Sequence, residues 1–352
     1  MKKLILLFLI ISANSFAQSN AQLADSVSKG FRGLLVVNEK VIWMSGQKGL
    51  IGISTNGGKK FKWNRVKGFE NSDFRSIHAF DKKNAVIANA GFPASILYTT
   101  NSGKSWTTVF QSKDSAMFFD GIDFWDALHG LIFGDPVNGR MYLSETMDGG
   151  KTWKEIPFDD RPQLKNGEAG FAASGTTIRV LAGGHVYVGT GGTCARLWHS
   201  RDYGHHWEVF ETPMLQGKPS QGIFSLAFCD TLHGVIVGGD YSNDTSAEKN
   251  CFITHDGGRS WIRPESPPKG YRSCVVFASE KYLIATGTSG MEYSIDGGVH
   301  WQNLNMAKSG NTVCVIYHFR SAESQFIDVY FVATNEAKFL KAGLGFDSHV
   351  DI

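Results

Sequence analysis

The chain has 352 residues, a formal net charge of +2 and 19% charged residues, and basic and acidic side chains are interspersed along it. It therefore lacks the basic patch that binds nucleic acid or an anionic membrane, and we expect neither partner. Glycine is frequent, with 40 residues, and proline is rare, with 9, as in proteins built from many short strands and turns.

The first residues are typical of a secretory signal peptide. Lys2 and Lys3 precede an apolar run, 4–11, that is too short to span a bilayer, and small residues lead to Ala17. We expect residues 1–17 to be the signal peptide. No cysteine near the cleavage point accepts a lipid, and no later stretch approaches the length of a membrane span. The expected location is outside the cytoplasm, periplasmic or extracellular.

Five cysteines are too few for a disulfide-held scaffold in a chain of this size, and an odd number leaves at least one unpaired. Cys229, Cys274 and Cys314 lie in apolar, strand-like runs and are interpreted as small buried residues. Cys194 and Cys251 form the one pair that we consider for a bridge, although connectivity cannot be derived from sequence. We find neither metal-ligand spacing nor a nucleotide-binding glycine motif, so we expect no metal and no cofactor.

A repeat of fixed period is the dominant feature of the sequence. Six segments share the pattern Ser/Thr-x-Asp/Asn-x-Gly-x-x-aromatic, and the Asp or Asn of each is 40 to 54 residues from the next, with an average of 48. The 335 residues of 18–352 therefore hold almost seven units in what we expect to be one domain. The Asp or Asn positions are Asn56, Asn101, Asp148, Asp202, Asp256 and Asp296.

Each of these segments predicts a tight turn between two strands. The Asp or Asn side chain can accept backbone N–H groups of the turn, and the glycine can adopt a positive φ. The aromatic residue then packs on the hairpin that the turn closes. We interpret the six Asp and Asn residues as structural, since six copies at one period argue against a catalytic role.

Two further strands precede each turn segment, most plainly at 121–135 and 223–238. Short polar turns join these two strands, with an aspartate that caps the turn and a histidine before a glycine. We interpret both histidines as turn residues rather than metal ligands. The turn residues are Asp126, His129, Asp230 and His233.

Four strands per unit predict an all-β fold, a β-propeller of seven four-stranded antiparallel blades, with six to eight blades as the range. The last unit, 312–341, has no turn segment after it and ends one strand short. Because propellers close their ring to avoid open sheet edges, we expect a strand at 23–28 to complete this blade.

The six turn segments resemble the Asp-box or BNR repeats first noted in sialidases. The fuller unit resembles the repeats of photosystem II stability/assembly factor propellers, and the match is best at 126–153 and 230–261. This resemblance implies a rigid propeller that holds another protein. It does not by itself define an activity, because one architecture hosts glycosidases, receptors and assembly factors.

A sialidase-like glycoside hydrolase or a glycan-binding propeller is the alternative. That resemblance implies an arginine clamp whose first member lies in an aromatic-Arg-Ile-Pro motif, and the nearest segments, at Arg32 and Arg75, lack the proline. Most glycoside hydrolysis also needs paired carboxylates. We assign no catalytic residue. The carboxylate pairs considered are Asp159 with Asp160 and Asp120 with Asp123.

Strand alternation places the start of each inner strand on the face opposite the six turn segments. The long connections 157–170 and 239–250 belong to the same face, and such insertions often carry function. Polar residues there are expected to ring the mouth of the central channel, where arginines would bind an acidic partner segment or a ligand carboxylate. We therefore expect a monomeric protein-binding or assembly scaffold. The hypothesised binding residues are Arg32, Arg75, Asp120, Asp135, Asp240 and Arg272.

Overall fold

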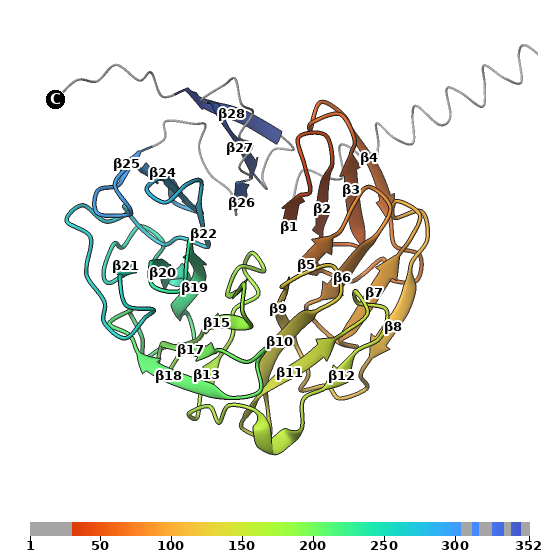
Figure 1. The fold of residues 1–352 in the computed structure, drawn as a ribbon, viewed down its shortest axis with the longest axis horizontal. Helices are drawn as coiled ribbons and strands as arrows, with labels where there is room; N and C mark the ends of the chain where they lie inside the picture. Colours follow the sequence, from red (N-terminus) through yellow and green to blue (C-terminus); the bar gives the residue numbers. More distant parts are fainter. Residues whose placement is uncertain (1–29, 304–311, 317–325, 334–338, 346–352) are drawn as a thin grey trace, which may run out of the picture.

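The computed structural model describes residues 30–303, 312–316, 326–333 and 339–345. The expected signal peptide, 1–17, and the expected closing strand, 23–28, lie outside the described residues. In the described part of the chain, antiparallel sheets are arranged around a central axis (Figure 1). None of the helices in that part is long and apolar enough to cross a membrane.

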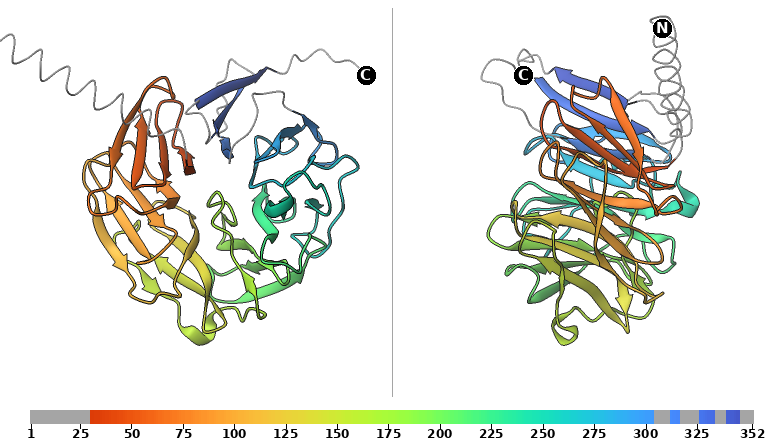
Figure 2. Two further views of the ribbon diagram at one scale, coloured as in Figure 1. Left: turned by 180° about the vertical axis from the view of Figure 1, so that it is seen from behind. Right: turned by 90° about the vertical axis from the view of Figure 1, so that its right-hand side faces the viewer.

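Six blades follow one another around the axis, as seen from both faces of the ring (Figures 1 and 2). Blade 1 contains β1 (Phe31–Val36), β2 (Ile42–Gly46), β3 (Leu50–Ser54) and β4 (Phe61–Arg65). Blade 2 contains β5 (Phe74–Ala79), β6 (Ala85–Asn89), β7 (Ser95–Thr99) and β8 (Thr107–Gln111). Blade 3 contains β9 (Phe119–Phe124), β10 (Gly130–Val137), β11 (Arg140–Thr146) and β12 (Lys154–Glu155).

The second half of the ring departs from the four-stranded pattern in one blade. Blade 4 contains β14 (Ile178–Leu181), β15 (His185–Gly189), β17 (Arg196–Ser200) and β18 (Trp207–Glu211). Blade 5 has five strands, because two short strands extend its inner edge; they are β13 (Glu168–Ala169), β16 (Gly191–Gly192), β19 (Gln221–Phe228), β20 (Gly234–Asp240) and β21 (Cys251–Thr254). Blade 6 contains β22 (Cys274–Phe277), β23 (Leu283–Gly287), β24 (Gly290–Ser294) and β25 (Gln302–Asn303).

The prediction of seven four-stranded blades is wrong in its count, although six lies within the expected range. The last unit forms a three-stranded sheet of β26 (Thr312–Ile316), β27 (Phe326–Ala333) and β28 (Phe339–Gly345). Its strand β26 lies next to both β22 and β1.

Most of the core lies between neighbouring blades, and one further apolar cluster lies within blade 1. Trp43 and Ile53 of blade 1 pack with Ile77 and Leu97 of blade 2, and the same arrangement recurs at the next junctions. Blades pack face to face because both faces of each middle strand are apolar, as the fully buried β2 illustrates. Removing this apolar area from water is the main force that holds the ring together.

The six turn segments lie on one face of the ring, which we call the turn face. Each turn repeats the same hydrogen bonds, as blade 3 shows. Asp148 Oδ1 accepts the backbone N–H of Lys151 at 3.0 Å and that of Thr152 at 2.9 Å, and the Thr146 hydroxyl accepts the N–H of Gly150 at 2.8 Å. Gly150 has a φ of +85°, which favours glycine.

The turns between the two inner strands also lie on the turn face. Asp126 accepts the backbone N–H groups of Leu128 and His129, and its other oxygen pairs with His129 Nδ1 at 2.8 Å. Asp230 and His233 repeat this arrangement in blade 5. The interpretation of both histidines as turn residues is confirmed.

We predict that Asp148→Ala and Asp256→Ala each lower the free energy of unfolding by about 1 to 3 kcal/mol, since each leaves turn N–H groups without an acceptor. Chemical denaturation measures the loss. Asp159→Ala is the matched control, because Asp159 is exposed and no side-chain hydrogen bond is recorded for it. A wild-type stability for either turn variant would contradict the structural interpretation.

Candidate binding site at the mouth of the channel

A segment between β13 and β14, residues 170–177, enters the centre of the ring, and we call it the plug (Figure 1). Hydrogen bonds join it to blades 5 and 6. Ser174 Oγ donates to the carbonyl of Ser273 at 2.7 Å, the hydroxyls of Thr176 and Ser225 lie 2.6 Å apart, and the Leu226 N–H donates to the Thr176 carbonyl at 3.0 Å. The plug therefore fills the narrow part of the channel.

The start of the plug is held by Glu168, which is fully buried. Its carboxylate pairs with the guanidinium of Arg196 and accepts hydrogen bonds from Thr190 Oγ1 at 2.6 Å and Trp198 Nε1 at 3.2 Å. These donors hold the pKa of Glu168 below its usual value, although burial alone would raise it. A buried carboxylate with this set of donors anchors the plug in one position.

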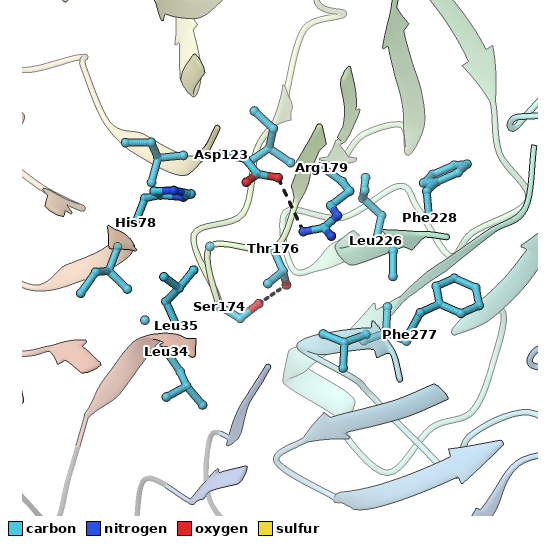
Figure 3. Close-up of a pocket in the computed structure, with 18 residues that line it drawn as sticks. Leu34, Leu35, His78, Asp123, Ser174, Thr176, Arg179, Leu226, Phe228 and Phe277 are labelled. Carbon is cyan, nitrogen blue, oxygen red and sulfur yellow. Dashed lines mark hydrogen bonds and ion pairs between the residues drawn. The ribbon is translucent and has the colours of Figure 1, made fainter. Parts of the chain in front are cut away.

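The plug divides the channel into two cavities. The first opens on the turn face, has a volume of about 150 Å³ and is mostly apolar, with Leu34, Ile122 and Phe228 in its wall (Figure 3). The second opens on the opposite face, which we call the mouth face, and has a volume of about 440 Å³. The mouth cavity is lined by Arg32, Arg75, Phe118, Asp120, Asp135, Gly170, Phe171, Ala172, Ala173, Phe224, Tyr241, Tyr271 and Thr288.

Four of the six hypothesised binding residues line the mouth cavity: Arg32, Arg75, Asp120 and Asp135. They come from the mouth-face ends of β1, β5, β9 and β10, so they follow one another around blades 1 to 3.

The two arginines differ in what they contact. Arg75 Nε donates to Asp73 Oδ2 at 2.8 Å, and Arg75 Nη1 donates to the carbonyl of Ala172 in the plug at 3.4 Å. Arg32 has no hydrogen bond or ion pair with any residue of the described ranges, and its Nε is buried. Burial, and then the charge of Arg75, lower the pKa of Arg32. The charge of Asp73 acts in the opposite direction. Arg32 is therefore a partly desolvated cation that makes no hydrogen bond or ion pair with the described residues.

The two acids lie on adjacent strands, with Asp120 buried and Asp135 half-buried. Asp120 is 1% exposed, and neither of its carboxylate oxygens has a partner among the residues that the structure describes. Asp135 Oδ1 accepts the N–H of Gly170 at 3.2 Å. Burial, and then the charge of Asp135, raise the pKa of Asp120 well above its usual range, and burial raises the pKa of Asp135 to about 6. The pair is therefore protonated near neutral pH more readily than ordinary carboxylates are.

The other two hypothesised residues lie outside the mouth cavity, and for them the expectation of a place in its wall is wrong. Arg272 is fully buried, pairs with Glu292 and donates to Ser289 Oγ at 2.7 Å. Asp240 accepts from Gln221 Nε2 at 2.9 Å and from the N–H of Ser242 at 2.9 Å. Both are satisfied within their own blades, because partners from the neighbouring strands reach them.

The carboxylate pairs considered for glycoside hydrolysis are not assembled into one site. Asp120 lines the mouth cavity, whereas Asp123 lines the turn-face cavity, where it accepts the N–H of Val180 at 3.0 Å (Figure 3). Asp159 and Asp160 are exposed in a short 3₁₀ helix and are not among the residues that line either cavity.

The turn-face cavity has one polar group without a recorded partner in the described ranges, the ring of His78. It packs in tilted contacts against Phe80 and Phe124, with ring centroids 4.9 and 4.3 Å apart. Burial lowers the pKa of His78 to about 4, so it is neutral at ordinary pH. Arg179 lies at the rim, 3.8 Å from Asp123.

Sequence reasoning did not identify the plug. One signal was present, since 170–177 consists of small residues apart from Phe171, and small side chains suit a narrow channel. The Cys194–Cys251 bridge is absent, because both are free thiols. No group of three or more His, Cys, Asp or Glu side chains in the described ranges is placed to bind a metal ion.

The architecture defines the class of protein: a β-propeller with a plugged channel and a charged mouth. No protein-family model and no curated protein matches the chain. Among solved structures it is similar to "YCF48 bound to D1 peptide", with 14% identity, a TM-score of 0.64 and coverage of 90% of this chain and 93% of the other.

Two further solved structures are similar in fold. YCF48 from Cyanidioschyzon merolae has 15% identity and a TM-score of 0.61, and covers 88% of this chain and 94% of its own. BamB from Moraxella catarrhalis has 12% identity and a TM-score of 0.52, and the match covers 92% of this chain and 85% of the BamB chain. At these identities the similarity establishes the propeller fold.

We predict opposite effects for two arginines. Arg272→Ala leaves the buried Glu292 without its cation and should lower the free energy of unfolding by about 3 to 5 kcal/mol. Arg32→Ala removes a desolvated charge that has no described partner and should leave stability within about 1 kcal/mol of wild type. Chemical denaturation of both variants checks this. A large loss for Arg32→Ala would show that Arg32 is structural.

The buried acid pair predicts a pH dependence of stability. The folded state raises the pKa of Asp135 from 3.8 to about 6, so it binds a proton that the unfolded chain releases. This contribution is complete below about pH 4 and is lost as pH rises through 6. Asp135→Asn should therefore gain about 2 kcal/mol relative to wild type between pH 4 and pH 7. Denaturation curves measure the free energy of unfolding of both proteins. The same difference between variant and wild type at pH 4 and at pH 7 would contradict the assignment.

Proposed function

We propose that the protein is an exported, monomeric scaffold that holds another protein, and that its mouth cavity binds an acidic segment of that partner through Arg32 and Arg75. The observation that carries the proposal is the guanidinium of Arg32, which is partly buried in the wall of the cavity and makes no hydrogen bond or ion pair with the described residues. A desolvated arginine gains strongly from a carboxylate, because its planar fork donates two parallel hydrogen bonds.

The surroundings of Arg32 support this interpretation. Arg75 is held toward the plug by Asp73 and Ala172, so it adds positive charge at a defined place. Tyr241, at the rim, is 53% exposed, and tyrosine and arginine are enriched among the residues that dominate interface energies. A rigid ring presents these groups without reordering, which lowers the entropic cost of binding.

The solved structures of similar fold favour the same class of function. One is a propeller bound to a peptide, named D1 peptide, and its fold matches over most of both chains. The Asp-box resemblance of the six turn segments and the export signal at 1–17 belong to this proposal too. A periplasmic or extracellular location would place the partner in the same compartment.

The experiment is capture of the native partner from an envelope extract with the immobilised protein, compared across variants. We expect Arg32→Ala to reduce capture at least tenfold, because losing an interface arginine of this kind costs about 2 kcal/mol or more. Capture by the wild type should also weaken with rising salt.

Arg179→Ala is the matched control, since Arg179 is an arginine at the rim of the other cavity. All variants are first shown to melt like wild type. Capture that is equally strong for Arg32→Ala and wild type, or that is lost only in Arg179→Ala, would refute the proposal for the mouth face.

A further inference from the structure

The acidic side of the mouth cavity lacks hydrogen-bond donors. Both oxygens of Asp120 are buried without a described partner, and Asp135 accepts one N–H through Oδ1. Burying a carboxylate without donors is costly, and native proteins rarely leave such groups unsatisfied. The site is also closely packed, because a Cβ on Gly170 would stand 2.3 Å from Asp120 Oδ2. Apart from a proton held by the pair itself, Asp120 has no donor among the described residues, and a donor from outside would satisfy it.

On the positive side of the cavity, Arg32 makes no hydrogen bond or ion pair with the described residues; the nearby Asp73 is bonded to Arg75 through Oδ2 and its Oδ1 has no partner there. Arg32 and the acid pair are separated in space. Arg75 is electrostatically close to both Arg32 and Asp120, whereas Asp120 is not among the charges that act on Arg32. Arg32, Arg75 and Asp120 belong to β1, β5 and β9 in that order. The cavity thus has an unpaired cation at blade 1 and an unsatisfied acid pair at blade 3, with the bonded Arg75 between them.

We propose that the Asp120–Asp135 pair receives a primary ammonium group of the same bound segment whose carboxylate meets Arg32, so that the mouth recognises an acidic residue and a lysine together. The proposal rests on the proposed function for its carboxylate half. Its lysine half rests on the carboxylate of Asp120, whose two oxygens are buried without a described partner.

An ammonium on an aliphatic stem fits this place better than other cations. Phe171 and Phe224 are stacked with ring centroids 3.8 Å apart and line the same cavity, and aromatic faces accommodate both methylene stems and cations. A compact point charge with three donors can serve both carboxylates at once. A divalent cation is disfavoured by the neighbouring guanidinium of Arg75.

The probe is a short peptide of glutamate, glycine and lysine, acetylated and amidated so that its only charges are on the side chains. Two relatives replace lysine by norleucine or glutamate by glutamine. In calorimetry at low salt and pH 7.5, wild-type protein should bind each altered peptide at least tenfold more weakly than the parent peptide. Because Asp135 has a pKa of about 6, the preference for lysine over norleucine should shrink below pH 6.

The variants separate the two halves of the site. Asp120→Asn and Asp135→Asn should abolish the preference for lysine over norleucine and keep the preference for glutamate over glutamine. Arg32→Gln should do the reverse. Asp123→Asn, on the same strand but at the other cavity, is the control and should keep both preferences.

Equal binding of the lysine and norleucine peptides by wild type would overturn this inference, and so would a lysine preference that survives in both aspartate variants. Absence of measurable binding by any of the peptides at 10 mM would overturn it too. A missing preference for glutamate, with the lysine preference intact, would instead refute the proposed function. The amide variants resemble the protonated acids in shape, so melting curves are expected to show that both variants fold.

Discussion

The central constraint on this molecule is the narrow axis on which the inner strands converge. Strands β5, β9, β19 and β22 lie close to this axis. The plug, 170–177, therefore makes hydrogen bonds to blades 2, 3, 5 and 6. Small residues make this possible. A Cβ at Gly121 would stand 2.7 Å from Ile178 and one at Gly175 would stand 3.1 Å from the Arg75 carbonyl. The plug turns one channel into two cavities of different chemistry.

Separation by the plug explains why residues that are neighbours in sequence act in different places. Asp120 and Asp123 are on one strand, yet one faces the mouth and the other the turn face. Asp123 is satisfied by the N–H groups of Phe124 and Val180, and Asp120 has no donor among the described residues. An aspartate is therefore a structural acceptor on the turn-face side of the plug, as Asp123, and an unsatisfied acid on the mouth side, as Asp120.

Local features of the fold could be predicted from the sequence, and non-local ones could not. The turn chemistry of Asp148 and the Asp126–His129 pair depends on residues a few positions apart, so the repeat pattern was sufficient. The fate of Arg272 depends on Glu292, which is two strands away, and no local signal indicated that they would pair. The last unit has three strands, as its sequence indicated, and the count of seven four-stranded blades depended on a non-local closing strand at 23–28, which lies outside the described residues.

The distribution of unsatisfied charge identifies the working face. In the described ranges, the charged side chains that have a buried polar atom without a partner are Arg32, Asp73 and Asp120. All three lie at the mouth-face ends of blades 1 to 3, whereas Arg272, Glu168 and Arg196 are buried in complete ion pairs elsewhere. The fold pairs these other buried charges, so the unpartnered groups at the mouth face are exceptional. Arg32 and Asp120 line the mouth cavity, where a bound ligand would complete their pairing.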